Sequence, residues 1–521
     1  MFKTILTTSL RRPGVFLRPA QQYGTRATKT TVIDSQIFGN IFSTPETTRI
    51  WSDRQRTAYF LDFEASLAKV QAKLGVIPHR AGDEIAKHCQ VESLDFELLR
   101  EQTELIGYPV LPVVKQLVAK VNAVEAGLGE WAHWGATTQD LTDTAVVLQL
   151  RDTLVLVEQS LNGIQNALEA LCKKYKTTPM AARSNLQQAV PVSFGFKMAR
   201  LLASFQRHQQ RLDELKPRLL VLQFSGAAGT LATIASESSY NAPNKVDGSP
   251  LGLRCQELLA EDLGLTTPAI AWHTERDNLA EVANYLATLT ATCAKFATDL
   301  KLMMQSEVGE AREPYVAHRG SSSTMPQKRN PIGCAYICSM AASVRTMASS
   351  MVEAVVADHE RSTGPWEIEW IVLPQICTLS HACLSHTQYL LEGLEVDGEA
   401  MKRNLALSKG AVVSEAVMMG LGKTIGRQVA HDIGRSSIPF SFLRTSSSQE
   451  TKFLLLIAVY DLCRKSQLQD KPLLELLRQH EDIKRAGLTD EELQNLCDPA
   501  NYLGLSEVMV DRVLNPATNT K

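Results

Sequence analysis

The chain has 521 residues, of which 44% are hydrophobic and 21% charged, and its formal net charge is −2 at pH 7. This length allows two or three domains with buried cores. The near-neutral charge argues against a nucleic-acid-binding protein, which is usually basic, and no apolar run reaches the length of a membrane span. The ten cysteines are scattered without a C-x-x-C pair, which indicates a reducing compartment and no metal site.

Residues 1–33 differ from the rest of the chain in charge. They contain six Lys and Arg residues and no acid, and the first acidic residue is Asp34. This composition predicts a mitochondrial transit peptide, with a disordered basic tail or a wrongly chosen start codon as alternatives.

Helical periods dominate the chain after residue 45, where strand signals are nearly absent. Apolar residues alternate spacings of four and three from Leu150 to Leu171 and again from Leu201 to Leu222. Such heptads bury a narrow apolar seam against neighbouring helices. His208 lies on the second seam, where we expect a core histidine rather than a ligand.

Three further helices are predicted over residues 277–310, 332–356 and 370–394. Five long helices predict an all-α fold built around a central bundle. The expected organisation is an N-terminal helical domain, a central five-helix bundle and a C-terminal helical domain, over residues 34–140, 141–394 and 395–521.

The first polar block, His133-Trp-Gly-Ala-Thr137-Thr138-Gln-Asp140-Leu-Thr-Asp143, precedes the first long helix. The hydroxyl groups of Thr137 and Thr138 can donate hydrogen bonds to a carboxylate. Asp140 and Asp143 are predicted in the first turns of the helix, where acids complement the helix dipole. We expect that capping role for Asp143, and a structural role is the alternative for His133.

Two shorter blocks follow the second seam. The run Gly226-Ala-Ala-Gly229-Thr predicts a turn with close backbone packing. In the block Trp-His273-Thr-Glu-Arg276-Asp277, His273 is a candidate substrate ligand or proton donor. Arg276 and Asp277 are expected to form a structural pair.

The most informative stretch is the signature loop, which we define as residues 318–331. It reads Gly320-Ser-Ser-Ser-Thr-Met-Pro-Gln-Lys-Arg-Asn-Pro331 after His-Arg. Lys328 can bind a carboxylate or a developing enolate, and Asn330 can donate a hydrogen bond to the same group. A serine in such a loop needs a dry, cationic site to act as a base.

A last block, Asp358-His-Glu-Arg361-Ser-Thr-Gly-Pro-Trp-Glu-Ile-Glu-Trp370, follows the fourth predicted helix. Arg361 is a candidate bidentate clamp for a carboxylate. The alternative is a structural ion pair between Arg361 and a neighbouring acid.

Together these blocks resemble the aspartase/fumarase superfamily. The first block resembles its H-x-G-x-T-S-x-D-x-x-D-T pattern, and the signature loop resembles G-S-S-x-x-M-P-x-K-x-N-P. The block from Asp358 to Trp370 resembles the H-E-R…G-x-W-x-x-E-W pattern of the carboxymuconate cycloisomerase branch. We treat that branch and the adenylosuccinate lyase branch as one group. The resemblance covers residues 40–432 and 459–515.

One block departs from the superfamily pattern. Where the superfamily commonly reads R-T-H-x-Q, this chain has Arg183-Ser184-Asn185-Leu-Gln187. The superfamily histidine is the general acid of several lyases, and an asparagine amide does not titrate near neutral pH. A leaving group that needs no proton, such as carbon dioxide, tolerates the change, as does an isomerisation with another acid.

The segment Gly434–Ala458 also departs from the superfamily pattern. In the superfamily, the residues that flank this segment usually form one continuous helix. Pro439 and a serine run cannot continue a helix. We interpret the segment as a retained intron or as a loop insertion.

The resemblance implies a cofactor-independent, metal-free homotetramer that acts on a small polycarboxylate, with each site built from three chains. It implies neither a nucleic-acid nor a membrane partner. Ser322 matches the catalytic serine, and Lys328 and His273 complete the predicted catalytic set. The predicted substrate-binding residues are His133, Thr137, Thr138, Arg183, Asn185, Gln187, Lys197, Asn330 and Arg361.

Three blocks, which begin at Thr103, Ala181 and Leu407, resemble fungal trans-aconitate decarboxylases most closely. Decarboxylation of trans-aconitate to itaconate is therefore the expected activity. The rivals are 3-carboxymuconate cycloisomerisation and an adenylosuccinate lyase-type β-elimination. An inactive, enzyme-derived binding or scaffold protein is the alternative from another class; Asn185 favours it, whereas Ser322 with Lys328 argues against it.

Overall fold

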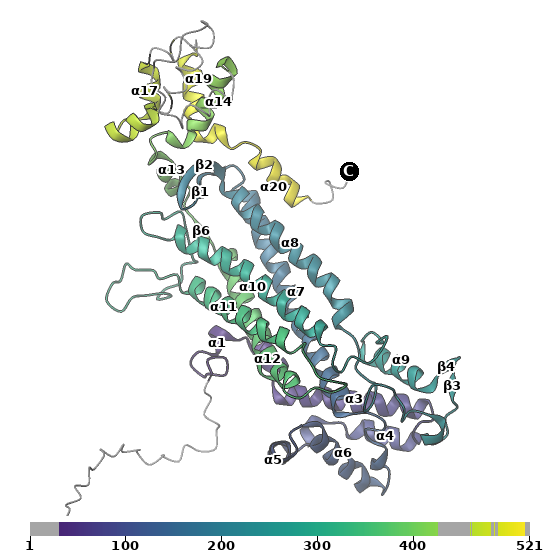
Figure 1. Ribbon diagram of the computed structural model, residues 1–521. Coiled ribbons are helices and arrows are strands. Elements are labelled where there is room, and N and C mark those ends of the chain that lie inside the picture. Colours follow the sequence, from purple (N-terminus) through teal and green to yellow (C-terminus); the bar gives the residue numbers. More distant parts are fainter. Residues whose placement is uncertain (1–30, 426–458, 460, 481–483, 485–487, 516–521) are drawn as a thin grey trace, which may run out of the picture.

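The computed structural model describes residues 31–425, 459, 461–480, 484 and 488–515. It is an elongated assembly of helices with three short two-stranded sheets (Figure 1). The predicted all-α class is therefore confirmed. Residues 1–30 of the predicted transit peptide and the segment Gly434–Ala458 lie outside the described residues. In the part that is described, no helix is both long and apolar enough to cross a membrane.

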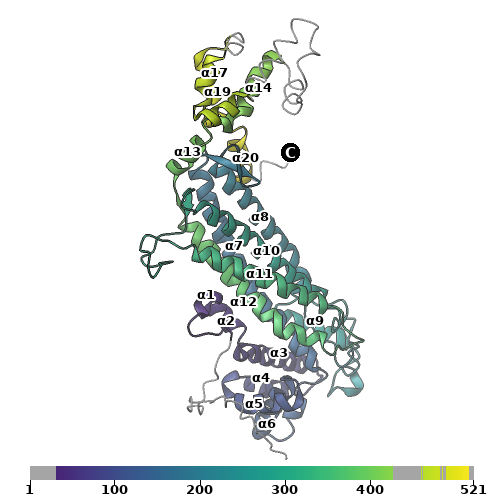
Figure 2. The same cartoon turned by 60° about the vertical axis from the view of Figure 1, so that its left-hand side comes forward.

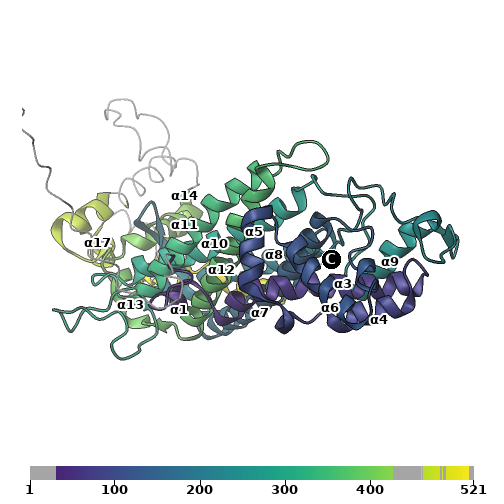
Figure 3. The ribbon, with the colours of Figure 1, turned by 90° about the horizontal axis from the view of Figure 1, so that it is seen from below.

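The N-terminal part covers one end of the molecule, which is the near end when the molecule is seen from below (Figure 3). A side-chain cap at Asp95 begins α5, and Gly107, at φ 93°, ends it. The apolar core of this part also includes Leu222, the last residue of the second seam, and Phe224 and Leu251 beyond it. Its helices are α1 (Gly39–Phe42), α2 (Pro45–Ile50), α3 (Asp53–Lys73), α4 (His79–His88), η1 (Val91–Ser93), α5 (Phe96–Ile106), α6 (Val110–Val124) and η2 (Gly129–Trp131), joined by η3 (Ser236–Ser238) and α9 (Leu251–Leu263).

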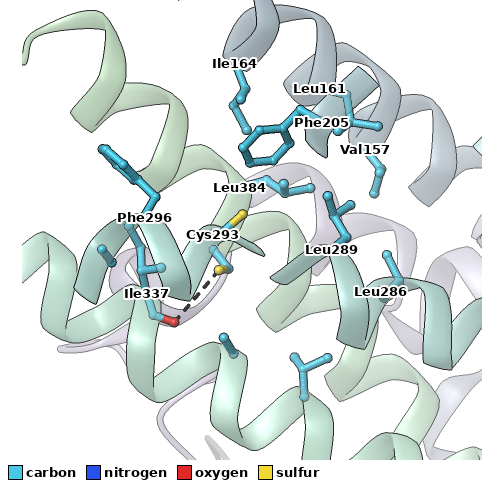
Figure 4. Packing of buried hydrophobic residues seen from close by; sticks show 14 of the residues in the cluster. Val157, Leu161, Ile164, Phe205, Leu286, Leu289, Cys293, Phe296, Ile337 and Leu384 are labelled. Atoms are coloured by element: carbon cyan, nitrogen blue, oxygen red, sulfur yellow. Dashed lines mark hydrogen bonds between the residues drawn. The ribbon is translucent and has the colours of Figure 1, made fainter. Parts of the chain in front are cut away.

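The central part is a bundle of five long helices that lie side by side (Figures 1 and 2). They are α7 (Thr138–Lys174), α8 (Phe194–Leu219), α10 (Asp277–Met303), α11 (Ile332–Glu353) and α12 (Pro365–Glu392). Every apolar position of the first seam, from Leu150 to Leu171, is buried. In Figure 4, Val157 and Phe205 face Leu289, so side chains of α7, α8 and α10 share one core. Helix α8 ends at Leu219, three residues earlier than the seam.

His208 is buried in this core, as predicted for the second seam. Its Nε2 lies 2.9 Å from the hydroxyl of Thr292, whereas Nδ1 has no partner among the described residues. Burial, together with Arg211 and Arg207, lowers the pKa of His208 to about 4. The ring is therefore neutral near pH 7 and serves as a packing residue.

The strands are the main departure from the sequence-based expectation. β1 (Pro179–Ser184) and β2 (Gln187–Ser193) form an antiparallel hairpin between α7 and α8. Its two turn residues, Asn185 at φ 50° and Leu186 at φ 65°, have the left-handed backbone of a type I′ turn. The other strands are two-residue pairs, which are too short for a periodic signal: β3 (Lys245–Val246) with β4 (Ser249–Pro250), and β5 (Ala311–Arg312) with β6 (Glu395–Val396).

The C-terminal part begins as a separate group of short helices and then returns to the bundle. These are α13 (Gly398–Ala406), η4 (Ala411–Val413), α14 (Ser414–Ile425), α17 (Leu473–Gln479), α19 (Asp490–Cys497), η7 (Pro499–Tyr502) and α20 (Ser506–Leu514). Helix α20 runs alongside α8 (Figure 1). Lys176 pairs with Asp511 at 2.7 Å, and Gln206 donates to the carbonyl oxygen of Val513 at 3.0 Å. The last helix thus packs on the central bundle.

Candidate active site

The predicted site residues lie at opposite ends of the bundle. The lower group, as seen in Figure 1, surrounds the start of α7 and contains His133, Thr137, Thr138, His273 and Arg361. The upper group surrounds the β1–β2 hairpin and the signature loop and contains Arg183, Asn185, Gln187, Lys197, Ser322, Lys328 and Asn330. Helix α7 runs between the two ends, and its 37 residues span about 55 Å at about 1.5 Å per residue.

His133 is bound at two points by one buried carboxylate of α3. Nδ1 of His133 lies 2.6 Å from Oε1 of Glu64, and the backbone N–H of His133 donates to Oε2 at 3.0 Å. The Glu64 side chain is 1% exposed, whereas that of His133 is 21% exposed. His133 also has a left-handed backbone, at φ 60°. Glu64 therefore fixes both the backbone and the ring of His133.

Asp140 connects three segments of the lower group. Its carboxylate accepts the backbone N–H groups of Thr137, Ser225 and Gly226 and lies 2.9 Å from Nε2 of His273. Asp140 is therefore part of a capping box, the kind of role that was expected for Asp143. It also ties the turn at residues 226–230 to the first block, which the sequence pattern alone did not reveal.

His273 is 4% exposed, and Asp140 occupies its Nε2. Its backbone carbonyl accepts the side-chain amide of Gln139 at 2.6 Å. These contacts place His273 inside the protein. They are more typical of a residue that positions Asp140 than of a residue that contacts a substrate.

A buried ion triad lies beside this network and corrects two expectations. Arg276 makes bidentate contacts with Asp143 at 2.8 and 3.0 Å and with Glu369 at 2.8 and 2.6 Å. All three side chains are at most 3% exposed. Asp143 therefore binds Arg276 instead of capping α7, and Arg276 pairs across the bundle rather than with its neighbour Asp277.

Arg361 lies on the connection between α11 and α12, close to the turn at residues 226–230. Its guanidinium donates to the carbonyl oxygen of Ala227 at 3.0 Å. No carboxylate of the described chain forms an ion pair with it, so the predicted structural ion pair is absent there. The remaining guanidinium N–H groups can receive a substrate carboxylate.

Two cations of the upper group, Arg183 and Lys197, pair with carboxylates of the same chain. Arg183 makes a bidentate pair with the buried Glu310 at 2.6 and 2.7 Å, and Lys197 pairs with Asp299 at 2.7 Å. Asn185 is exposed on the turn, and Gln187 is exposed at the start of β2. In one chain, therefore, Arg183 and Lys197 order the upper end of the bundle.

The signature loop projects from the upper end and is closed at its base. The backbone and side-chain N–H groups of Asn330 both donate to the carbonyl oxygen of Gly320, at 3.0 and 2.9 Å. A Cβ at Gly320 would lie 2.5 Å from the carbonyl oxygen of Asn330, and its φ is 69°, so only glycine fits there. Arg329 fixes the same base through Glu395, at 3.0 and 3.2 Å. Asn330 thus has a structural role in the loop, whichever group Lys328 contacts.

Ser322 is half-buried in the loop, between exposed neighbours. Its Oγ accepts the backbone N–H groups of Thr324 and Met325 at 3.4 and 3.2 Å. These contacts are local to the loop, and no histidine of the described chain forms a hydrogen bond with Ser322.

The sequence reasoning missed the buried acids that organise the site. Glu64, Glu310 and Glu369 each bind a histidine or arginine from a distant block, and the part-exposed Glu395 binds Arg329 in the same way. An isolated acid carries no sequence signal for such a role. The described residues contain no group of three or more His, Cys, Asp or Glu side chains placed to bind a metal ion.

Comparison with known proteins places these blocks in a family. Residues 40–346 match the protein family described as "Lyase", and residues 457–513 match the family "Adenylosuccinate lyase C-terminus". The chain belongs to the aspartase/fumarase superfamily of lyases.

Several relatives within this superfamily match nearly the whole chain. Trans-aconitate decarboxylase 1 of Mycosarcoma maydis is 50% identical over 476 residues, which cover 91% of this chain and 88% of that protein. The 3-carboxy-cis,cis-muconate cycloisomerase of Pseudomonas aeruginosa is 39% identical and covers 92% of this chain and 96% of its own. The crystal structure of 3-carboxy-cis,cis-muconate lactonizing enzyme from Pseudomonas putida superposes with a TM-score of 0.80 at 36% identity, covering 93% of this chain and 99% of that chain.

Proposed function

We propose that this protein is a cofactor-independent lyase that decarboxylates trans-aconitate to itaconate. The observation that carries the proposal is the 50% identity to a trans-aconitate decarboxylase over 91% of the chain. Asn185 supports it, because the superfamily position of a general acid holds a non-titrating amide on an exposed turn.

The chemistry of the reaction fits this set of residues. When the carboxylate on the saturated carbon leaves as carbon dioxide, its bonding electron pair stays on the substrate as an allylic carbanion. The carbanion is delocalised toward the carboxylate at the far end of the double bond, so the site needs cations there and one proton. Carbon dioxide itself leaves without a proton, whereas an amine or hydroxide leaving group needs one.

We assign the carboxylate contacts to cationic and hydroxyl groups from both ends of the bundle. Arg361, Thr137 and Thr138 of the lower group bind carboxylates through donated hydrogen bonds. Lys328 and the hydroxyl of Ser322, both in the signature loop, stabilise the charge that develops beside the reacting carbon.

These two groups can form one site only if more than one chain contributes. We propose a homotetramer in which the upper group of one chain meets the lower group of another. Exposed apolar side chains on the bundle support such packing. Leu302 of α10 is 40% exposed, Val352 of α11 is 51% exposed, Ile371 of α12 is 64% exposed, and Val356, just after α11, is 74% exposed. Light scattering coupled to gel filtration would measure the mass, and a monomer with full activity would contradict this assembly.

The second candidate function is a cycloisomerase or β-eliminating lyase. The 39% identity to a 3-carboxy-cis,cis-muconate cycloisomerase favours it. An inactive binding protein is the weaker alternative, because the signature loop retains both Ser322 and Lys328.

A substrate panel separates these functions. We expect carbon dioxide and itaconate from trans-aconitate, and no cleavage of adenylosuccinate, because the non-titrating Asn185 occupies the position of the acid that protonates such leaving groups in the superfamily. The full chain would be incubated separately with trans-aconitate, cis-aconitate, 3-carboxymuconate and adenylosuccinate, and products would be followed by chromatography and carbon dioxide release. Fumarate from adenylosuccinate without carbon dioxide from either aconitate would replace the proposed reaction by β-elimination.

A further inference from the structure

The reaction proposed above requires a proton donor, and the superfamily position for one is Asn185. Two other candidates named from the sequence are disfavoured by their surroundings. His273 is 4% exposed and has its Nε2 bound to Asp140. The hydroxyl of Ser322 is a weak acid, and among the described residues its oxygen contacts only backbone N–H groups of its own loop.

His133 has the opposite arrangement. Nδ1 is fixed by the buried Glu64, whereas Nε2 makes no hydrogen bond with the described residues, and the side chain is 21% exposed. One ring nitrogen is thus anchored to the protein and the other is available to a ligand. This is the arrangement in which a carboxylate orients a histidine for proton transfer.

The backbone of His133 supports a functional role. A non-glycine residue at φ 60° is conformationally costly and persists only when its surroundings hold it. The surroundings do so at three points. Glu64 accepts the backbone N–H of His133, Gln71 donates to the carbonyl oxygen of Trp134 at 2.7 Å, and Trp134 packs on Trp131 with ring centroids 4.8 Å apart.

The charges that face His133 come from two helices. Burial disfavours the charged ring, but the carboxylates of Glu64 on α3 and, more weakly, Asp140 on α7 outweigh it, so the pKa of His133 is raised. Cys89 lies near Glu64 and Asp62. Burial raises the pKa of its thiol, so the thiol is uncharged. The ring is therefore protonated over a wider pH range than a free histidine, with Nε2–H as a donor.

We propose that His133 delivers the proton that replaces carbon dioxide on the substrate, and that Glu64 is its positioning residue. The inference rests on the proposed decarboxylation. The bond between the saturated carbon and its carboxylate breaks, carbon dioxide leaves, and the electron pair shifts through the double bond to the far carbon. Nε2–H of His133 gives its proton to that carbon, which forms itaconate. The neutral ring then regains a proton from water, so one proton is consumed per turnover.

The titration of His133 tests the first half of this inference without the reaction. Proton NMR of the histidine C2–H signals, assigned by loss of one signal in His133→Gln, should give a pKa for His133 above that of an exposed histidine. Glu64→Gln keeps the shape of the side chain but removes its charge, so the pKa should fall. Glu92→Gln, at an exposed pair with Arg54, is the matched control. An unshifted pKa in Glu64→Gln would overturn the role of Glu64.

The pH dependence of kcat on trans-aconitate tests the second half. A donor must be protonated, so kcat should fall as pH rises through the pKa of His133, and this alkaline limb should move to lower pH in Glu64→Gln. His133→Gln should lower kcat by about 100-fold or more and lose the limb, whereas His79→Gln, exposed at the start of α4, should behave as the parent. Circular dichroism checks folding, and Glu64→Asp is a second variant if Glu64→Gln does not fold.

The reaction in deuterium oxide distinguishes donation from mere binding. The parent protein should place one deuterium on the saturated methylene of itaconate and form a single enantiomer, because a fixed donor protonates the planar carbanion from one side. Residual turnover by His133→Gln should give both enantiomers, since solvent then supplies the proton. One enantiomer at near-normal kcat from His133→Gln would overturn His133 as the donor while leaving decarboxylation intact. A parent protein that forms no itaconate would contradict the proposed function and the donor assignment together.

Discussion

Replacing Ser322 by Ala is expected to lower kcat on trans-aconitate by about two orders of magnitude or more, the usual loss when a hydrogen-bond donor to the developing charge is removed. Oγ accepts hydrogen bonds from two backbone N–H groups of its own loop, which fix its position and leave its O–H free to donate to the substrate. Alanine removes that oxygen and leaves the base of the loop unchanged, because Asn330 and Gly320 hold the base. Steady-state kinetics with circular dichroism would measure the loss at constant fold.

Two neighbouring residues give this test its comparison. Ser323→Ala, on the same exposed loop, is the matched control and should retain the parent kcat. Lys328→Met should raise KM and lower kcat together, because the ammonium interacts with both the bound carboxylate and the developing charge. Near-normal turnover in both Ser322→Ala and Lys328→Met would show that the chemistry is elsewhere.

Replacing Arg276 by Met is expected to lower the free energy of unfolding by about 3–5 kcal/mol, the range for removing one partner of a buried ion pair. The guanidinium is the shared partner of Asp143 and Glu369, and all three groups are buried. Without it, two desolvated carboxylates would face each other. It also lies 5.1 Å from the centre of the Trp272 ring, and that contact would be lost as well.

Thermal and urea unfolding at one fixed chain concentration would measure this loss, since an oligomer's stability depends on concentration. Arg54→Met is the matched control, because Arg54 pairs with Glu92 on the surface at 58% and 66% exposure, where such pairs contribute about 0–1 kcal/mol. Equal losses in the two variants would contradict the assigned role of the triad.

The helical architecture was predictable because its signal is local. The seam from Leu150 to Leu171 repeats with the period of a helix, and every member of it is buried. The β1–β2 hairpin was missed because its main signal is the left-handed turn at Asn185 and Leu186. In the sequence, the asparagine in place of the superfamily histidine was interpreted only as the loss of an acid. Asparagine is one of the few residues that readily adopt this backbone, so the same residue serves the turn.

The sequence by itself determined the helix class, the superfamily blocks and the missing acid at Asn185, because each depends on residues close together in the chain. Only the tertiary structure decided which carboxylate binds which arginine or histidine. Asp143 and Arg276 are 133 residues apart, and Glu64 and His133 are 69 apart; no local pattern links them. The role of a buried carboxylate depends on the cation that the fold places beside it. The tertiary structure likewise separated Lys328 from Arg361 by the length of the bundle, which a linear pattern of blocks does not encode.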